Sequence, residues 1–222
     1  MALMGRGDLT GALEDFDAAL SVAPGNATLY AKRANAYYRL EAYRRALADY
    51  NRALDLQPSQ VITYLNRGLA YMALDEIERA IQDYDEALER APEYALAYFY
   101  RGQAYVQRGE DQRALADYEE ALRLDPDNPR ILTGLGMAYA RMLDYDQALN
   151  AYRRAIVLDS ENARAYYNAA CAAALNENPD QAIEWLEQAI ALRPQYRAMA
   201  QQDPDFSFIR DHPTFERVVG EP

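Results

Sequence analysis

The sequence predicts an all-α fold made of stacked helix pairs, and three observations support that prediction. Prolines recur every 34 residues, at positions 24, 58, 92, 126 and 194, with Ser160 in the one missing place. Alanines recur with the same spacing, at 12, 46, 80, 114, 148 and 182. Between the prolines, apolar residues three and four apart describe amphipathic helices. A period of this length is typical of repeat proteins whose units share a continuous core.

The period divides the chain into units whose positions we number as slots 1 to 34. We expect two helices in each complete unit, over slots 1–14 and slots 18–31. Proline at slot 32 ends the second helix, because it lacks a backbone N–H and clashes with the preceding turn. The predicted boundaries are 1–26 for a truncated first unit that is mainly its second helix, 27–60, 61–94, 95–128, 129–162 and 163–196 for complete units, and 197–222 for a C-terminal capping segment.

The residues at the repeating slots resemble a known family. The run Tyr98-x-x-Arg101-Gly102-x-Ala104-Tyr105, followed by Ala114, Tyr118, Ala121 and Pro126, is similar to a tetratricopeptide repeat (TPR), and the resemblance covers nearly the whole chain. It implies a right-handed superhelical solenoid whose first helices line the concave inner surface. The departures from the pattern, which predict looser packing of the last complete unit, are Ser160, Ala173, Leu186 and Pro179. The capping segment resembles that of many bacterial proteins of this family, which predicts a bacterial source.

The two ends of the chain carry different expectations. At the N-terminus, residues 1–6 supply only the end of a first helix, so we expect the apolar side of the helix over 7–23 to be poorly covered, at Leu9, Leu13, Phe16 and Leu20. Either more chain precedes this edge or the edge meets another molecule. At the C-terminus, the apolar residues expected to close the last repeat are Phe206, Phe208, Ile209, Phe215 and Val218.

Charge is distributed unevenly between the two sets of helices. The chain has 35 acidic and 23 basic residues, yet the five predicted first helices contain no Asp or Glu. Arginine occupies slot 7 of the same three units that have aspartate at slot 23, which predicts ion pairs between the two helices of a unit, namely Arg33 with Asp49, Arg67 with Asp83, and Arg101 with Asp117. The other two units have Leu135 with Ala151 and Ala169 with Trp185.

The first helices also supply the candidate binding residues. By the family resemblance, slots 2, 5, 6, 9, 12 and 13 face the concave groove, where an apolar and aromatic strip lies between basic ends. Amides can hydrogen-bond the backbone of an extended peptide while apolar positions accept its side chains. Alternatively, neighbouring units or the C-terminal tail cover this strip. The predicted groove residues are Lys32, Asn35, Arg39, Leu65, Asn66, Leu69, Phe99, Tyr100, Gln103, Arg130, Met137, Arg141, Arg164, Tyr167 and Asn168.

These patterns favour a non-enzymatic module that binds an extended acidic and apolar segment of a partner protein. The alternative is a scaffold that forms homo-oligomers through the N-terminal edge. We find no Gly-rich phosphate loop, no metal-ligand spacing and no nucleophile–base pair, so we expect no enzymatic activity, metal or cofactor. The net charge of −12 argues against nucleic acid, and no apolar stretch is long enough for membrane insertion. We expect a cytoplasmic protein, or a periplasmic one if an upstream segment is missing, in which Cys171 is a small packed residue.

Overall fold

The computed structural model describes residues 6–220, and in that range every regular element is a helix. The repeat pattern explains their order, because each complete unit contributes two helices of 13 or 14 residues. The first element is α1 (Arg6–Val22). It is followed by α2 (Ala27–Arg39), α3 (Tyr43–Leu56), α4 (Val61–Ala73), α5 (Ile77–Arg90), α6 (Ala95–Arg108), α7 (Asp111–Leu124), α8 (Pro129–Arg141), α9 (Tyr145–Leu158), α10 (Ala163–Leu175), α11 (Pro179–Leu192), α12 (Gln195–Gln202), η1 (Pro204–Ile209) and α13 (Pro213–Val219).

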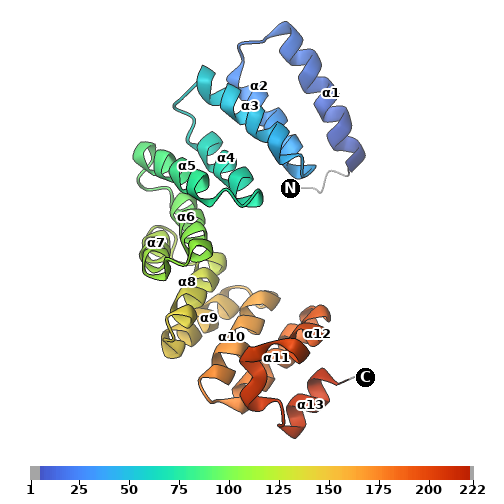
Figure 1. Ribbon diagram of the computed structural model, residues 1–222, viewed down its shortest axis with the longest axis vertical. Coiled ribbons are helices and arrows are strands. Elements are labelled where there is room, and N and C mark those ends of the chain that lie inside the picture. The colour runs from blue at the N-terminus through green and yellow to red at the C-terminus, as the bar shows by residue number, and fades with distance from the viewer. Residues whose placement is uncertain (1–5, 221–222) are drawn as a thin grey trace. The chain divides into compact units, whose positions relative to one another are not determined.

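The chain forms two compact units, Met1–Arg108 and Gly109–Pro222, which we call the N-unit and the C-unit. In the N-unit, α2 packs on α3 and α4 on α5, as Figure 1 shows, and the first helices α2, α4 and α6 contact one another in succession. In the C-unit, α8 packs on α9 and α10 on α11, while α8 also contacts α10. The all-helical repeat fold is confirmed. Within the N-unit, and likewise within the C-unit, the first helices of the repeats form one continuous layer.

Local sequence accounts for the helix starts. The side chain of Asn26 accepts a hydrogen bond from the backbone N–H of Leu29, and Asn162 does the same for Ala165. Such caps satisfy backbone donors that the first turn of a helix leaves unpaired. Asn178 caps α11 in this way, and Pro179 occupies its first turn, where a missing N–H costs nothing.

The prediction of looser packing in the last complete unit is wrong. Ala173 and Leu186, which stand where other units have tyrosine, are completely buried in the core of the C-unit. Phe206 and Phe215 of the capping segment belong to the same core cluster. The tail therefore adds aromatic residues to the core of the last complete repeat.

The turn between the two helices of each complete 34-residue repeat has a shared conformation. Its slot-15 residue has a positive φ in all five units: 60° at Glu41, 61° at Asp75, 63° at Leu143, 56° at Glu177 and 80° at Gly109. This left-handed region is favourable for glycine but costs a residue with a side chain about 1 kcal/mol or more. Of the five residues, Gly109 is the one whose residue type favours this left-handed conformation.

A small residue at slot 8 allows the two helices of one repeat to approach closely. A Cβ atom added to Gly68 would lie 2.5 Å from the ring of Tyr84, and one added to Gly136 would lie 2.6 Å from the ring of Tyr152. The tyrosines at slot 24, including Tyr50 and Tyr118, are almost completely buried. The core of the pairs α4–α5 and α8–α9 is thus a tyrosine ring against a glycine.

The terminal segments correct two expectations. Residues 1–5, the start of the expected truncated first helix, lie outside the described residues. Leu9 and Leu20 on α1 are buried, while Leu13 and Phe16 are half-buried, so the apolar side of α1 is better covered than we expected. This burial leaves less apolar surface for self-association through that edge than the sequence predicted.

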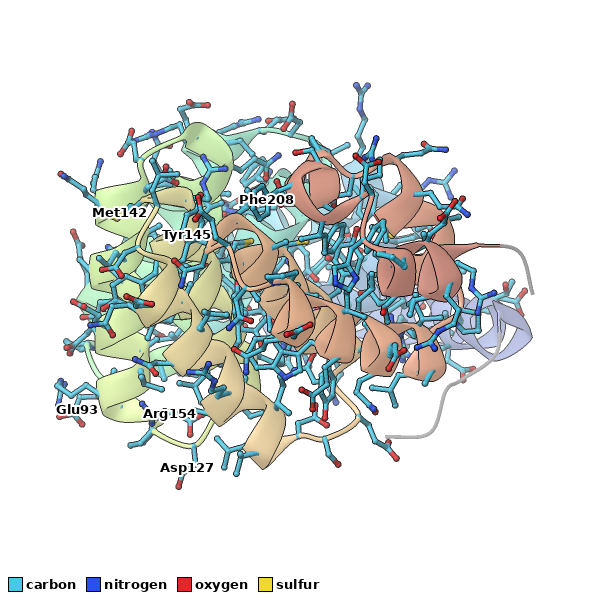
Figure 2. All side chains as sticks on the ribbon, turned by 90° about the horizontal axis from the view of Figure 1, so that it is seen from below. Glu93, Asp127, Met142, Tyr145, Arg154 and Phe208 are labelled. Atoms are coloured by element: carbon cyan, nitrogen blue, oxygen red, sulfur yellow. The ribbon has the colours of Figure 1, made fainter. Side chains whose placement is uncertain are left out.

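The capping segment closes the C-unit as predicted, with one exception. Phe206, Ile209 and Phe215 are buried, and Val218 packs partly against the same core. Phe208 was expected to join them, but 66% of it is exposed at the surface (Figure 2). The reason is the short helix η1, in which Phe206 and Ile209 are three positions apart and take the inward face.

Candidate peptide-binding surface

Arginine at slot 7 links three helices in the N-unit. Arg33 on α2 donates two hydrogen bonds to Asp49 on α3, from Nε and Nη2, each 2.7 Å long. Its third nitrogen, Nη1, donates to Asp17 on α1 at 2.5 Å. The guanidinium group therefore holds its own helix pair and the preceding helix together. We call this arrangement the arginine fork.

The fork recurs one repeat later. Arg67 on α4 donates to both carboxylate oxygens of Asp83 on α5, at 2.8 and 2.5 Å, and to Asn51 of the preceding repeat at 2.8 Å. Only 4% of the Asp83 side chain is exposed. The predicted pairs of Arg33 and Arg67 are confirmed, whereas Arg101 with Asp117 would join the N-unit to the C-unit and stays a prediction.

Two tyrosines flank each fork, a feature that we did not predict. The guanidinium carbon of Arg67 lies 5.5 Å from the ring centre of Tyr64 and 5.9 Å from that of Tyr71. Arg33 and Arg101 have equivalent neighbours at slots 4 and 11. The sequence contains the signal, since tyrosine fills both slots only in the three units with arginine at slot 7. These rings stabilise the cation as well as filling the core.

All fifteen predicted groove residues lie on the first helices, but they differ in exposure. The exposed ones are Lys32, Asn35, Arg39, Arg130, Arg141 and Arg164. The half-buried ones are Asn66, Leu69, Tyr100, Gln103, Met137 and Asn168. Leu65 and Phe99 are only 4% and 3% exposed, and Tyr167 is buried too. These three were expected to contact a ligand directly, and the correction is that they belong to the packing between helices.

Four of the predicted residues meet in the N-unit around a pocket of about 220 Å³, which we call the amide pocket. It is lined by Asn35, Arg39, Asn66 and Leu69 together with two tyrosines that we did not single out, Tyr38 and Tyr50. Asn35 Oδ1 accepts hydrogen bonds from the hydroxyl of Tyr50 at 2.6 Å and from Nδ2 of Asn66 at 3.1 Å. The two amides are therefore held in register across consecutive repeats.

The next repeat shows what happens without such an amide. Leu69 stands at the slot that Asn35 occupies, and the hydroxyl of Tyr84, the counterpart of Tyr50, is buried without a hydrogen-bond partner. An unsatisfied buried hydroxyl costs about 1–3 kcal/mol. The amide at slot 9 therefore stabilises the repeat as well as presenting polar atoms to the groove.

Five other predicted residues line a larger pocket in the C-unit, of about 490 Å³, which we call the tail pocket. They are Met137, Arg141, Arg164, Tyr167 and Asn168. The capping segment adds Asp203 and Asp205 to the same pocket. The hydroxyl of Tyr167 donates to Asp203 Oδ2 at 2.7 Å, which holds the tail against α10. In this region the tail contacts predicted groove residues, as the alternative interpretation of the sequence expects.

Cys171 also lines the tail pocket. Burial, together with the nearby charges of Asp203 and Asp205, raises the pKa of its thiol far above the ordinary range. A thiol must lose its proton to act as a nucleophile or to ligate a metal. Cys171 is therefore a packed residue, as the sequence suggested, and it stays protonated at neutral pH.

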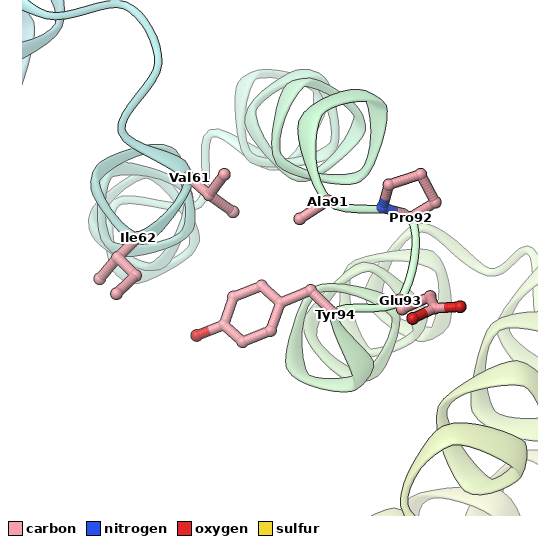
Figure 3. Close-up of a pocket in the computed structure, with 6 residues that line it drawn as sticks. All are labelled: Val61, Ile62, Ala91, Pro92, Glu93 and Tyr94. Carbon is pink, nitrogen blue, oxygen red and sulfur yellow. The ribbon is translucent and has the colours of Figure 1, made fainter.

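A third pocket has a different origin. It measures about 710 Å³ and lies between the start of α4 and the turn before α6, lined by Val61, Ile62, Ala91, Pro92, Glu93 and Tyr94. In Figure 3 the ring of Tyr94 extends towards Ile62, whereas Glu93 points away. A pocket of about 550 Å³ recurs one period earlier, at Ala27, Thr28 and Gln57. This hollow is a consequence of repeat stacking and contains none of the predicted groove residues.

Comparison with known proteins agrees with this geometry. Sequence models described as TPR repeat match residues 40–75 and 102–142, and models described as tetratricopeptide repeat match 61–94 and 133–197. Together these matches cover more than half of the chain. The chain belongs to the tetratricopeptide repeat family. Among curated protein sequences, none matches it significantly.

Solved structures of TPR proteins are similar as well. YrrB, described as a TPR protein with an unusual peptide-binding site, is 26% identical, with a TM-score of 0.66 over 86% of this chain and all of its own. Cut9 in its complex with Hcn1, of the APC/C, gives a TM-score of 0.76 at 19% identity, over 96% of this chain and 40% of the other. MamA from Desulfovibrio magneticus RS-1 gives 0.69 at 20% identity, over 76% and 96%. The last two likenesses concern the fold alone.

Tetratricopeptide repeat proteins are generally non-enzymatic scaffolds for protein interactions. Over residues 6–220, no helix is both long and apolar enough to cross a membrane.

Proposed function

We propose that this protein is an interaction module whose first helices bind an extended segment of a partner protein, with acidic and apolar side chains. The observation that carries the proposal is the amide pocket of the N-unit, which has bases and unpaired amide groups on one surface. The similarity to YrrB, a TPR protein with an unusual peptide-binding site, supports the same class of ligand.

The two amides present complementary groups to a peptide backbone. Asn35 uses its oxygen to accept from Tyr50 and Asn66, so its Nδ2 donor stays available, while Asn66 keeps its Oδ1 acceptor. In the described part of the chain, neither group has another protein partner. A peptide backbone offers one C=O and one N–H per residue. A donor and an acceptor side by side can therefore hold an extended chain whatever its side chains are.

Two bases give the amide pocket its charge preference. Lys32, Asn35 and Arg39 lie three and four positions apart on α2, which places them on one face. Both bases are exposed, and neither forms an ion pair with any residue that the structure describes. As predicted, α2, α4, α6, α8 and α10 contain no acidic residue that could compete. An acidic side chain of the bound segment would meet both bases without displacing another carboxylate.

Binding can be tested with an array of 12-residue peptides that vary in acidic, basic and apolar content. We expect acidic and apolar sequences to bind, with affinity that falls as salt rises. Arg39→Glu should weaken this binding about tenfold or more, and Asn66→Ala by a few fold, since one hydrogen bond contributes about 1 kcal/mol. Fluorescence polarisation of the selected peptides gives both ratios.

Arg44→Glu is a matched control, because Arg44 is an exposed arginine on the second helix α3 and undergoes the same change of charge. It should leave peptide affinity within about twofold. Equal losses in Arg39→Glu and Arg44→Glu would mean that peptides respond to net charge alone. No loss in either would contradict a site at the amide pocket.

A further inference from the structure

The tail pocket of the C-unit contains two carboxylates, Asp203 and Asp205, that form no ion pair with any residue the structure describes. We propose that it binds a primary ammonium group, such as the end of a lysine side chain on a bound partner segment. This goes beyond the proposed function, because the sequence predicted a basic surface and an acidic ligand throughout. The proposal is independent of peptide binding at the amide pocket, because that pocket lies in the N-unit.

Asp205 is the origin of the unbalanced charge. Its carboxylate is half-buried in the tail pocket, beside Asp203 and the Sγ atom of Cys171, and one oxygen or sulfur atom from each of the three lies within 4.8 Å of the others. The hydrogen-bond donor that faces Asp205 from this group is the thiol of Cys171, which is a weak donor. Burial and the charge of Asp203 raise the pKa of Asp205, as expected for a carboxylate that lacks a cationic partner.

Asp203 is in a different position, because both of its oxygens are in use. Oδ2 accepts from the hydroxyl of Tyr167, and Oδ1 accepts from the backbone N–H of Asp205 at 3.1 Å. Those donors are neutral, so the charge of Asp203 is stabilised but not cancelled. Two adjacent carboxylates thus share one polar pocket with no positive group between them.

Three arginines lie near these carboxylates, and the contact given for each of them is to another group. Arg141 pairs with Asp111 at 2.5 Å, Arg210 donates to the backbone oxygen of Asp203 at 3.1 Å, and Arg164 has its Nη2 atom 4.0 Å from the sulfur of Met137. Within the described residues, none of them forms an ion pair with Asp203 or Asp205. Arg141 and Arg164 line the same pocket and are exposed, whereas the half-buried carboxylates of Asp203 and Asp205 have no cationic partner and remain available to a positive ligand.

The walls of the tail pocket suit an alkyl chain that ends in an ammonium group. Tyr145, Tyr152 and Tyr167 contribute aromatic surface, and Ala172 and Leu175 contribute aliphatic surface. The ring of Tyr167 is fixed by stacking on Tyr196, with 4.5 Å between ring centres. An aliphatic stem can lie along such walls, while its charged end gains both from carboxylates and from aromatic faces.

A metal ion is a poorer fit to the same atoms. Cys171 stays protonated, and a thiol binds metal as the thiolate. Without a thiolate, the group offers only two carboxylates, fewer protein ligands than most metal sites have. An ammonium group needs no thiolate, because it donates to carboxylate lone pairs that are still unused.

The test is a titration followed by amide chemical shifts, with N-acetyl-lysine N-methylamide as the probe. Its neutral analogue, N-acetyl-norleucine N-methylamide, has the same stem without the charge. We expect saturable shifts at residues 167–172 and 203–206 with the lysine probe and none with the norleucine probe. Asp205→Asn should weaken lysine binding at least about tenfold, because it keeps the shape and removes the charge.

Asp211→Asn is the matched control, since Asp211 is an exposed acid of the same tail outside the tail pocket. It should leave the affinity within about twofold. If the spectrum of Asp205→Asn indicates misfolding, Asp203→Asn provides a second variant with the same expected loss. Equal shifts from both probes, or unchanged lysine binding in both tail-pocket variants, would overturn the proposal. Broadening of the same amides by MnCl₂ at concentrations far below those needed for lysine would replace it with a metal site.

Discussion

The N-unit and the C-unit join the helices of a repeat by different means at the same slots. In the N-unit, Arg33 and Arg67 form arginine forks with aspartates of the facing helix. In the C-unit, Leu135 stands opposite Ala151, and Ala169 opposite Trp185, and all four are buried. A helix pair of this family therefore closes through a buried ion pair or through apolar packing, and neither is required for the fold.

The two units also differ in what they present to a ligand. The N-unit offers the amide pocket, with unpaired bases beside it, whereas the C-unit offers the tail pocket, with unpaired carboxylates inside it. The difference comes from the capping segment, which brings Asp203 and Asp205 to the first-helix layer of the C-unit. Under the two binding proposals, one repeating scaffold has opposite charge preferences at its two pockets, because an irregular segment is added at one end.

Breaking an arginine fork is expected to have the largest effect on stability. Arg67→Ala leaves Asp83 buried without a partner, and losing one member of a buried pair costs about 3–5 kcal/mol. Urea unfolding followed by circular dichroism measures the change. Adding Asp83→Ala to Arg67→Ala should cause little further loss, whereas losses that simply add would contradict the pairing.

A second form of this experiment replaces the ion pair of the N-unit by the apolar residues that the C-unit has at the same slots. Arg67→Leu combined with Asp83→Ala copies Leu135 and Ala151. Replacing both members of a buried pair by apolar residues is often neutral. The double variant should therefore be more stable than Arg67→Ala alone.

The slot-15 turn is alike in both units, so its substitution should have a moderate and predictable effect. Gly109→Ala places a side chain at a φ of 80° and should cost about 1 kcal/mol, while Leu143→Gly removes the same strain and should gain a few tenths to 1 kcal/mol. Thermal unfolding of both variants measures this. A loss of stability in Leu143→Gly would mean that the Leu143 side chain, although 72% exposed, contributes more by packing than its backbone conformation costs.

The smallest effect concerns the pH dependence that Asp205 gives to the C-unit. Because the pKa of Asp205 is raised in the folded protein, folding is disfavoured above that pKa, and the cost disappears as pH falls to the ordinary value of 3.8. Asp205→Asn should therefore be more stable than the wild type at pH 7, by less than about 1 kcal/mol after solvent screening. Urea unfolding should show this difference shrinking between pH 7 and pH 4. A variant that is less stable at pH 7 would contradict the assignment.

The repeat pattern predicted most of the fold because it is regular. Helix bounds differ by only one residue from slots 1–14 and 18–31, since proline and asparagine mark the ends of helices in the sequence. The ion pairs of Arg33 and Arg67 were predicted because slots 7 and 23 change together. The prediction that Phe208 is buried was wrong because the tail is not part of the repeat pattern. Which of its residues point inward depends on where η1 begins.

The candidate binding surface was predicted less well than the fold. Periodicity identifies the helix face but not the depth of each residue, so it predicts that Leu65 and Phe99 face the groove although they are buried. Asp203 lies 36 positions after Tyr167, and nothing in the sequence pattern indicates that the two are in contact. Contacts made by an irregular segment depend on tertiary packing, which local spacing does not encode.

The arginine fork also affects how the chain comes apart. Each fork in the N-unit ties a helix pair to the helix before it, so its loss loosens two adjacent repeats at once. In a linear array, such links raise the coupling between nearest neighbours relative to the stability of a single repeat. Strong coupling makes neighbouring repeats open together in one cooperative block, whereas weak coupling lets them fray one at a time. A polar side chain with three well-placed donors thus sets the size of the smallest piece of this protein that can unfold.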